Sequence, residues 1–153
     1  MKNFHDLIAE LGEFIGEELT VDLNQACFLE INNNLKVQIE LDPPGEKILL
    51  MSKIIELPPG KFRENILRDG LKANFLAEEK EGILSYLERQ NTLVLCHDLY
   101  THSITMNILH EHLIKFIERA TKWFTAIEAG RSSPDIGEIP EITEKKGSLF
   151  GFK

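Results

Sequence analysis

The sequence has little cysteine, no long apolar run and a shortage of basic residues, and each shortage excludes a class of protein. Two cysteines among 153 residues cannot form the disulfide framework of a small secreted domain, so a reducing, cytoplasmic compartment is expected. No apolar run approaches the roughly 18 residues of a membrane-spanning helix, and we expect neither membrane insertion nor a secretory signal. The 17 Lys and Arg against 25 Asp and Glu give a formal charge of −8, which argues against a nucleic-acid-binding protein.

The short motifs of catalysis and cofactor binding are also missing. There is no glycine-rich phosphate loop, no Cys-x-x-Cys, no nucleophile elbow and no His-Glu-x-x-His. Each of these motifs places particular groups at a spacing that its chemistry requires. We therefore expect no catalytic residue, no cofactor and no metal site, and a protein that is not an enzyme.

Two weaker alternatives stay open. A small enzyme or ligand-binding domain would use His97, Asp98 and His102, which lie between the last strand and the last helix. It predicts an enclosed pocket with convergent polar groups near them. A metal sensor would use His110 and His112, but residues two apart on a helix point to different faces. Cys27 and Cys96 lie among apolar strand residues, where cysteine packs as a small hydrophobe.

The length and overall composition of the sequence are those of one ordinary domain with its own core. Residues 1–129 hold 13 basic and 21 acidic residues, whereas residues 130–153 are neutral. Residues 131–153 have no hydrophobic period, and Phe150 and Phe152 near their end are candidates for a weak contact. We predict a structured domain over residues 1–130 and a flexible C-terminal tail over residues 131–153.

Hydrophobic periodicity predicts an α+β fold. Apolar residues three and four apart predict helices over residues 3–19, 61–77 and 105–129. Alternation and turn residues predict three antiparallel strands over residues 26–31, 35–41 and 47–55, and a β-hairpin over residues 83–88 and 92–98. The predicted order is helix, three-strand meander, helix, hairpin and long C-terminal helix.

The strand over residues 47–55 is apolar on both sides, so the predicted meander has more apolar surface than one helix covers. Phe28, Leu49 and Met51 fall on positions that can face away from the core. An uncovered apolar strip on an antiparallel sheet is a partner-binding site or an aggregation hazard. Two interpretations remain: a partner binds this strip, or dimerisation or the tail covers it.

The order of elements and several stretches resemble the class I type III secretion chaperones, the Tir chaperone (CesT) family. The resemblance covers residues 3–130. The stretches that carry it are Leu-Pro-Pro at 57–59, residues 62–67, 73–75, 82–86 and 93–95, and Trp123 in the long helix.

The resemblance implies a cytoplasmic homodimer without cofactor that binds the N-terminal segments of secreted effector proteins. Components of the secretion apparatus are further candidate partners. Strand addition and apolar pockets are the recognition mode implied. The implied partner-binding patch consists of Phe4, Leu7, Ile8, Leu11, Phe28, Leu49 and Met51. The implied dimer interface consists of Phe62, Ile66, Leu67, Gly70, Leu71, Ile83, Ser85 and Leu87. An adaptor of the same fold that binds a folded partner is the main alternative.

Overall fold

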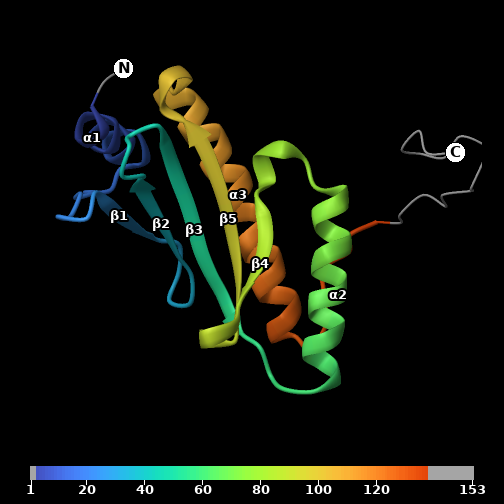
Figure 1. Ribbon diagram of the computed structural model, residues 1–153. Helices are drawn as coiled ribbons and strands as arrows, with labels where there is room; N and C mark the ends of the chain where they lie inside the picture. The colour runs from blue at the N-terminus through green and yellow to red at the C-terminus, as the bar shows by residue number, and fades with distance from the viewer. Residues whose placement is uncertain (1–2, 138–153) are drawn as a thin grey trace, which may run out of the picture.

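A computed structural model describes residues 3–137, which form one layer of sheet with helices on one side and at both edges (Figure 1). In chain order the helices and strands are α1 Phe4–Ile15, β1 Ala26–Glu30, β2 Lys36–Leu41, β3 Lys47–Glu56, α2 Lys61–Leu76, β4 Ile83–Leu87, β5 Thr92–Tyr100 and α3 Met106–Glu128. Short 3₁₀ turns at Glu79–Glu81, Glu88–Gln90 and Thr101–Ser103 join the later elements. The predicted α+β class and order of elements are confirmed.

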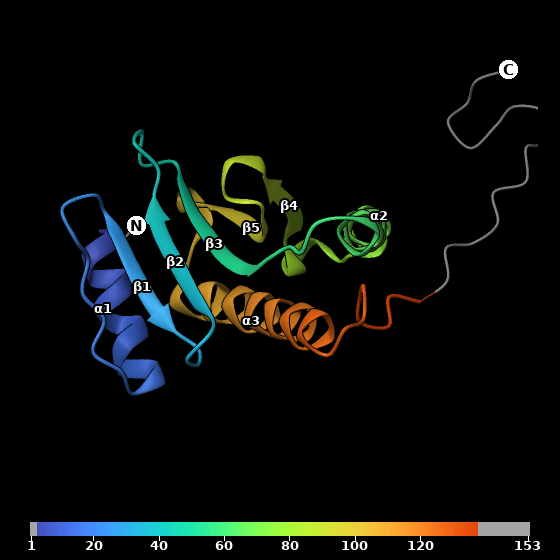
Figure 2. The same ribbon diagram turned by 90° about the horizontal axis from the view of Figure 1, so that it is seen from below.

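The five strands form one antiparallel sheet in the order β1-β2-β3-β5-β4. The hairpin β4–β5 therefore joins the meander through β5, which pairs with β3 along nearly its whole length. Viewed from below, α3 runs along one face of the sheet, α1 lies beside β1 and α2 lies beyond β4 (Figure 2). The other face of the sheet carries no helix among the described residues.

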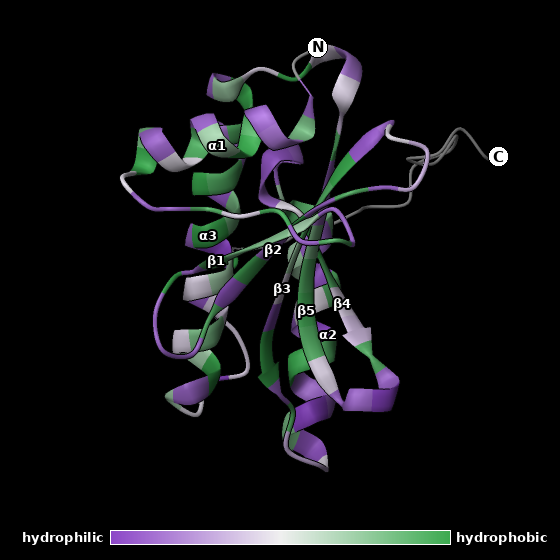
Figure 3. Ribbon diagram, turned by 90° about the vertical axis from the view of Figure 1, so that its left-hand side faces the viewer, coloured by the Kyte–Doolittle hydropathy of each residue, from purple (hydrophilic) through white to green (hydrophobic). Residues whose placement is uncertain are grey.

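The first helix begins and ends at residues that explain its length. Asn3 is the N-cap, and its side-chain oxygen accepts a hydrogen bond of 2.8 Å from the Asp6 N–H, as its residue type favours. The helix ends at Ile15 because Gly16 takes a left-handed conformation with φ of 77°. The expectation that the helix continues to residue 19 is therefore wrong: the apolar period continues, but glycine ends the helix. Figure 3 shows hydrophilic and hydrophobic residues alternating along α1.

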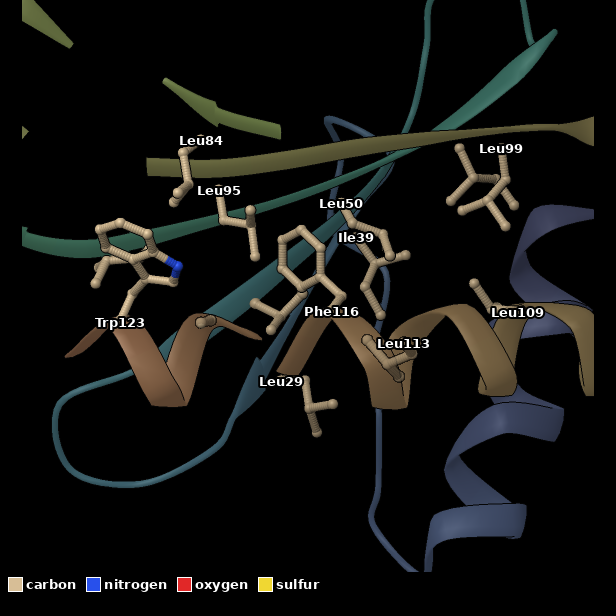
Figure 4. Close-up of a cluster of buried hydrophobic side chains, with 14 of the residues drawn as sticks. Leu29, Ile39, Leu50, Leu84, Leu95, Leu99, Leu109, Leu113, Phe116 and Trp123 are labelled. Carbon is tan, nitrogen blue, oxygen red and sulfur yellow. The ribbon is translucent and has the colours of Figure 1, made fainter. Parts of the chain in front are cut away.

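The core lies between α3 and the sheet. Phe116 and Trp123 on α3 are almost fully buried, and both point towards the sheet in Figure 4. They meet strand residues such as Leu50 and Leu95, which are also inaccessible. Full burial of a side chain of this size contributes about 1.5–3 kcal/mol, so this layer fixes α3 against the sheet.

Asn91 closes the β4–β5 hairpin in a left-handed conformation with φ of 49°. Its side-chain oxygen accepts hydrogen bonds from the Tyr86 hydroxyl at 2.5 Å and from Arg63 Nη1 at 3.1 Å. Its Nδ2 donates to the Leu57 carbonyl oxygen at 2.7 Å. Asparagine tolerates this backbone region better than most residues. One side chain therefore joins the hairpin to the start of α2 and to the end of β3.

The described part of the C-terminal segment, residues 131–137, packs against the helices. Ser132 Oγ donates to Asp69 Oδ2 of α2 at 2.5 Å, and Ile136 is half-buried against the core. Gly130, with φ of 83°, turns the chain after α3. The boundary predicted at residue 130 remains a prediction. Phe150 and Phe152 lie outside the described residues.

Candidate functional site

The uncovered face of the sheet carries an apolar row that crosses all five strands. The strand register places Phe28 opposite Gln38, Gln38 opposite Met51, Met51 opposite Cys96 and Cys96 opposite Ile83. Side chains alternate between the two faces of a strand, so these five share one face of the sheet. It is the face opposite α3, which lies behind the sheet in Figure 1. We call them the cross-strand row. Four of the five are apolar or weakly polar, and the row therefore gives the open face an apolar centre.

The row and its neighbours are accessible although they are apolar. Phe28 is 54% exposed, Ile83 62% and Leu49 37%, whereas Met51 is half-buried. Two adjoining hollows of about 400 and 420 Å³ lie over this face and share Gln38 and Met51. The predicted surplus of apolar strand surface at Phe28, Leu49 and Met51 is thus present and open. Exposed apolar surface on this scale marks an interaction site more often than chance.

Charged side chains stand at opposite ends of the two hollows. Glu40 and Asp98 line the first hollow, beside Leu49. Asp98 accepts a hydrogen bond of 2.6 Å from Lys47 Nζ, which raises the pKa of Lys47. Lys36 and Lys53 line the second hollow, beside Phe28. The open face therefore combines an apolar centre with a carboxylate end and an ammonium end.

The first helix does not contribute its predicted residues to this surface. The four apolar side chains predicted for it are at most 4% exposed and belong to the core cluster. The expectation that they share a patch with the strand residues is therefore wrong, because these side chains are buried in the core. The residues concerned are Phe4, Leu7, Ile8 and Leu11.

A second apolar surface lies on α2 and the adjoining strand β4. Leu71 is 73% exposed, Phe75 63% and Ile83 62%. Leu71 and Phe75 are four residues apart and therefore neighbours on the outer side of α2. Phe75 was missed as an interface candidate, although this same spacing from Leu71 could have indicated it.

The other residues of the predicted dimer interface divide between the two sides of α2 and β4. Ile66 and Gly70 are buried, and a Cβ placed on Gly70 would lie 3.9 Å from Leu84 of the same chain. Gly70 therefore lies close to this chain's own strand β4, and its place in the dimer interface stays a prediction. Phe62, Leu67 and Leu87 are half-buried, and Ser85 is exposed.

A histidine pair joins β5 to α3. His97 Nε2 and His112 Nδ1 are 2.8 Å apart. The two ring planes differ by 11°, and the ring centroids are 5.0 Å apart. This centroid distance is longer than the distance between the bonded nitrogens by about two ring radii, so the rings meet edge to edge. Burial lowers the pKa of both imidazoles. One nitrogen donates and the other accepts, so the pair holds both rings in a neutral hydrogen bond.

The pair lines a hollow of about 500 Å³ with Asp98, Glu78 and Glu79. The three residues of the enzyme alternative do not come together, because His97 bonds to His112 and His102 is exposed and packs against Tyr100. His110 contacts Phe14, with ring centroids 4.5 Å apart. His110 and His112 therefore point to different neighbours, as their spacing predicts. Within residues 3–137 no group of three or more His, Cys, Asp and Glu side chains is arranged to hold a metal ion.

The two cysteines lie on opposite faces of the sheet. Cys27 is 1% exposed in the core, and Cys96 is half-buried in the cross-strand row. Burial raises the pKa of both thiols, which keeps them protonated at neutral pH and lowers their nucleophilicity.

The sheet with an open apolar face is the feature of the fold that most resembles an interaction surface. The Tir chaperone protein (CesT) family model matches residues 6–124. The chain therefore belongs to the Tir chaperone (CesT) family. No curated protein matches the sequence. No helix in the described part of the chain is long and apolar enough to cross a membrane.

Solved structures with this fold include chains of several protein complexes. A chain of the HopA1-SchA chaperone–effector complex matches with 15% identity and a TM-score of 0.65, over 80% of this chain and 94% of that one. A chain of the ExsC-ExsE complex matches with 19% identity and a TM-score of 0.66, over 79% and 90%. A chain of the ExoT-SpcS complex from Pseudomonas aeruginosa matches with 12% identity and a TM-score of 0.60, over 79% and 97%.

Proposed function

We propose that this protein is a cytoplasmic type III secretion chaperone that binds the N-terminal segment of secreted effector proteins and keeps it soluble. Its family and the chaperone–effector complex that shares its fold support this function. The open apolar face of the sheet is the observation that assigns this function to particular residues. A disordered segment laid over Phe28, Leu49 and Met51 would remove this surface from water. Binding of this kind is a function without chemistry, so no catalytic group is assigned.

We propose further that the protein acts as a homodimer, with α2 and β4 at the contact. Leu71, Phe75 and Ile83 supply an exposed apolar strip on that side of the molecule. Ile83 is also the last residue of the cross-strand row. A dimer through this strip would therefore place the row of one protomer close to that of its partner, and one segment could follow both.

Co-expression tests the chaperone function directly. The full chain, carrying an affinity tag, is produced together with the N-terminal segment of a secreted protein encoded beside its gene. We expect the segment to co-purify with the wild type and to be lost with Met51→Asp, because a carboxylate in the apolar centre would have to be desolvated. Leu23→Asp is the matched control, since Leu23 is 100% exposed in the loop before β1. Equal recovery of the segment with both variants would contradict the assignment of this face.

An adaptor that binds a folded partner is the second candidate, since the same open face suits either kind of partner. The two are separated by proteolysis of the bound segment alone and in the complex. A chaperone orders a segment that is digested when free. A partner that resists digestion before it binds would favour the adaptor.

A further inference from the structure

The charged residues of the open face lie on the two sides of the cross-strand row. Glu40, Leu49 and Asp98 are paired across β2, β3 and β5 and form the neighbouring row on one side. Lys36 and Lys53 lie on the other side, each two residues along its strand from the cross-strand row. The hollow of about 400 Å³ over the first side therefore has an apolar floor beside carboxylates. It suits a segment that combines apolar and basic side chains.

Glu40 is the carboxylate that such a segment would meet without displacing another cation. Asp98 already accepts a hydrogen bond of 2.6 Å from Lys47 Nζ. Among the described residues no cation pairs with Glu40, which accepts a hydrogen bond of 2.7 Å from the neutral Gln38 Nε2. Because exposed ion pairs are weak, the apolar side chains would supply most of the contact, and Glu40 would favour a basic segment over an acidic one.

Residues 145–153 of this chain, Lys-Lys-Gly-Ser-Leu-Phe-Gly-Phe-Lys, have this composition. They contain three lysines and no acidic residue, and Leu149, Phe150 and Phe152 lie between the lysines. Phe150 and Phe152 are two residues apart, so their rings point to the same side of an extended chain. Residues 138–144, in contrast, contain three glutamates and no basic residue. Residues 145–153 are therefore the part of this segment that matches an apolar hollow beside carboxylates.

A series of adjoining hollows leads from the end of the described chain to this surface. Ile136 lines a hollow of about 180 Å³ together with Ala77, which follows α2. Ala77 also lines the hollow of about 500 Å³. That hollow shares Ile83 and Asp98 with the hollow over Leu49. The chain therefore leaves the described structure on the side of the molecule from which the open face is reached past α2 and β4.

The segment is long enough for this path. The helix α2 is about 10–12 Å across, and three gaps of about 4.8 Å separate β4 from β2. Leu149 follows Gly137 by 12 residues, and an extended chain of that length spans about 40 Å. The apolar residues of the segment can therefore reach the hollow with length to spare.

We propose that residues 145–153 cover the hollow over Leu49 and Met51 of their own chain when no partner occupies it. The rings of Phe150 and Phe152 lie against these two side chains, and a lysine of the segment pairs with Glu40. The tether gives the segment a local concentration in the millimolar range, so a weak contact is enough to cover the surface. The inference rests on the proposed chaperone function in one respect: an effector segment that uses this surface must displace residues 145–153.

A photoreactive residue in place of Gln38, which lines the hollow, tests which segment covers it. The full chain is illuminated without a partner, as a mixture of unlabelled and isotope-labelled chains, and mass spectrometry identifies the linked peptides. We expect links to residues 145–153 within one chain. The same photoreactive residue in place of Leu23, which is 100% exposed in the loop before β1, is the control and should give no such link. Links between two chains, or none to residues 145–153, would overturn the proposal.

A competing peptide tests whether the hollow is already occupied. The probe is Lys-Lys-Gly-Ser-Leu-Phe-Gly-Phe-Lys, acetylated and amidated to remove its terminal charges, and NMR titration of the full-length protein gives its dissociation constant. Phe150→Ser combined with Phe152→Ser should bind the peptide about three- to tenfold more tightly than the wild type, because the tethered competitor is weakened. Ile139→Ser combined with Ile142→Ser removes two apolar side chains from residues 138–144 and should keep the wild-type affinity. Equal affinity in all three proteins would contradict the proposal.

Charge reversal tests the side of the row on which the segment lies. In the variant with Phe150→Ser and Phe152→Ser, the further change Glu40→Lys should weaken binding of the peptide, because it replaces attraction of the lysines by repulsion. Lys53→Glu, on the other side of the row, is the matched control and should not weaken it. The same affinity with Glu40→Lys as without it would count against the proposed contact.

The outcomes separate this inference from the proposed function. If a secreted segment co-purifies with the protein while Gln38 gives no link to residues 145–153, the chaperone function stands and this inference alone fails. If the link forms and no secreted segment is bound, the contact within the chain stands and the proposed function fails.

Discussion

Asn74 on α2 forms two hydrogen bonds with the backbone of Leu84 on β4. Its Nδ2 donates to the Leu84 carbonyl oxygen at 2.8 Å, and its Oδ1 accepts from the Leu84 N–H at 2.8 Å. The strand β4 is at one edge of the sheet, where backbone groups would otherwise lack a strand partner. One amide side chain therefore takes the place of a neighbouring strand and ties α2 to this edge.

Removing this amide should destabilise the protein. Asn74→Ala leaves a part-buried N–H and carbonyl group without these partners, which costs about 1–3 kcal/mol, although alanine favours helix. Urea unfolding followed by circular dichroism measures the change in the free energy of unfolding. Lys72→Ala, at an exposed position of the same helix, is the control and should change stability by less than about 0.5 kcal/mol. If Asn74→Ala leaves the free energy of unfolding unchanged, the two hydrogen bonds do not contribute to stability.

The histidine pair predicts that stability falls on acidification. Burial lowers the pKa of His97 and of His112 below the ordinary 6.5, so the unfolded chain binds more protons than the folded one between those values. The free energy of unfolding should therefore decrease as the pH falls through 6.5 and continue to decrease until the lowered pKa values are passed. The charged groups around the pair are Asp98, Glu79, Lys80 and Glu111.

Unfolding in urea at a series of pH values from 8 to 5 measures this dependence. The double variant His97→Phe with His112→Leu should show a flatter curve over this range, whatever its absolute stability. His102→Gln, which removes an exposed histidine, is the control. If the double variant keeps the slope of the wild type, other groups are responsible.

The proposed dimer contact predicts a change of oligomeric state. Leu71→Glu combined with Phe75→Glu puts two carboxylates on the exposed side of α2, where a dimer would have to bury them. We expect the dimer dissociation constant to rise at least tenfold, as measured by light scattering over a dilution series. Leu23→Glu adds charge to another exposed apolar position and should leave the mass unchanged. A dimer that survives the α2 variant would place the contact elsewhere.

The period of the apolar residues predicted the elements and their order well. Alternation in β2 and the two apolar sides of β3 predicted that Phe28, Leu49 and Met51 face away from the core, and their exposure agrees. Residue type also explains the N-cap Asn3 and the turn at Gly130. These features depend only on residues that are close together in the sequence, so they could be predicted from the sequence.

The surfaces were predicted less well, because an apolar face looks the same whatever covers it. The predicted partner-binding patch included Leu7 and Leu11, yet both are buried in this chain's own core. Gly70 looked like a contact between two helices, yet Leu84 of the same chain lies next to it. Hydrophobic periodicity shows that one face of an element is apolar. It does not show which other surface that face packs against.

The sequence by itself determined an α+β chain whose strands carry more apolar surface than its helices cover. Only the tertiary structure decided that His97 meets His112, that Asn74 covers the edge at Leu84, and that one apolar row crosses five strands. These relations join residues of different elements. They depend on strand order and register, which follow from the packing of the whole core rather than from any local segment.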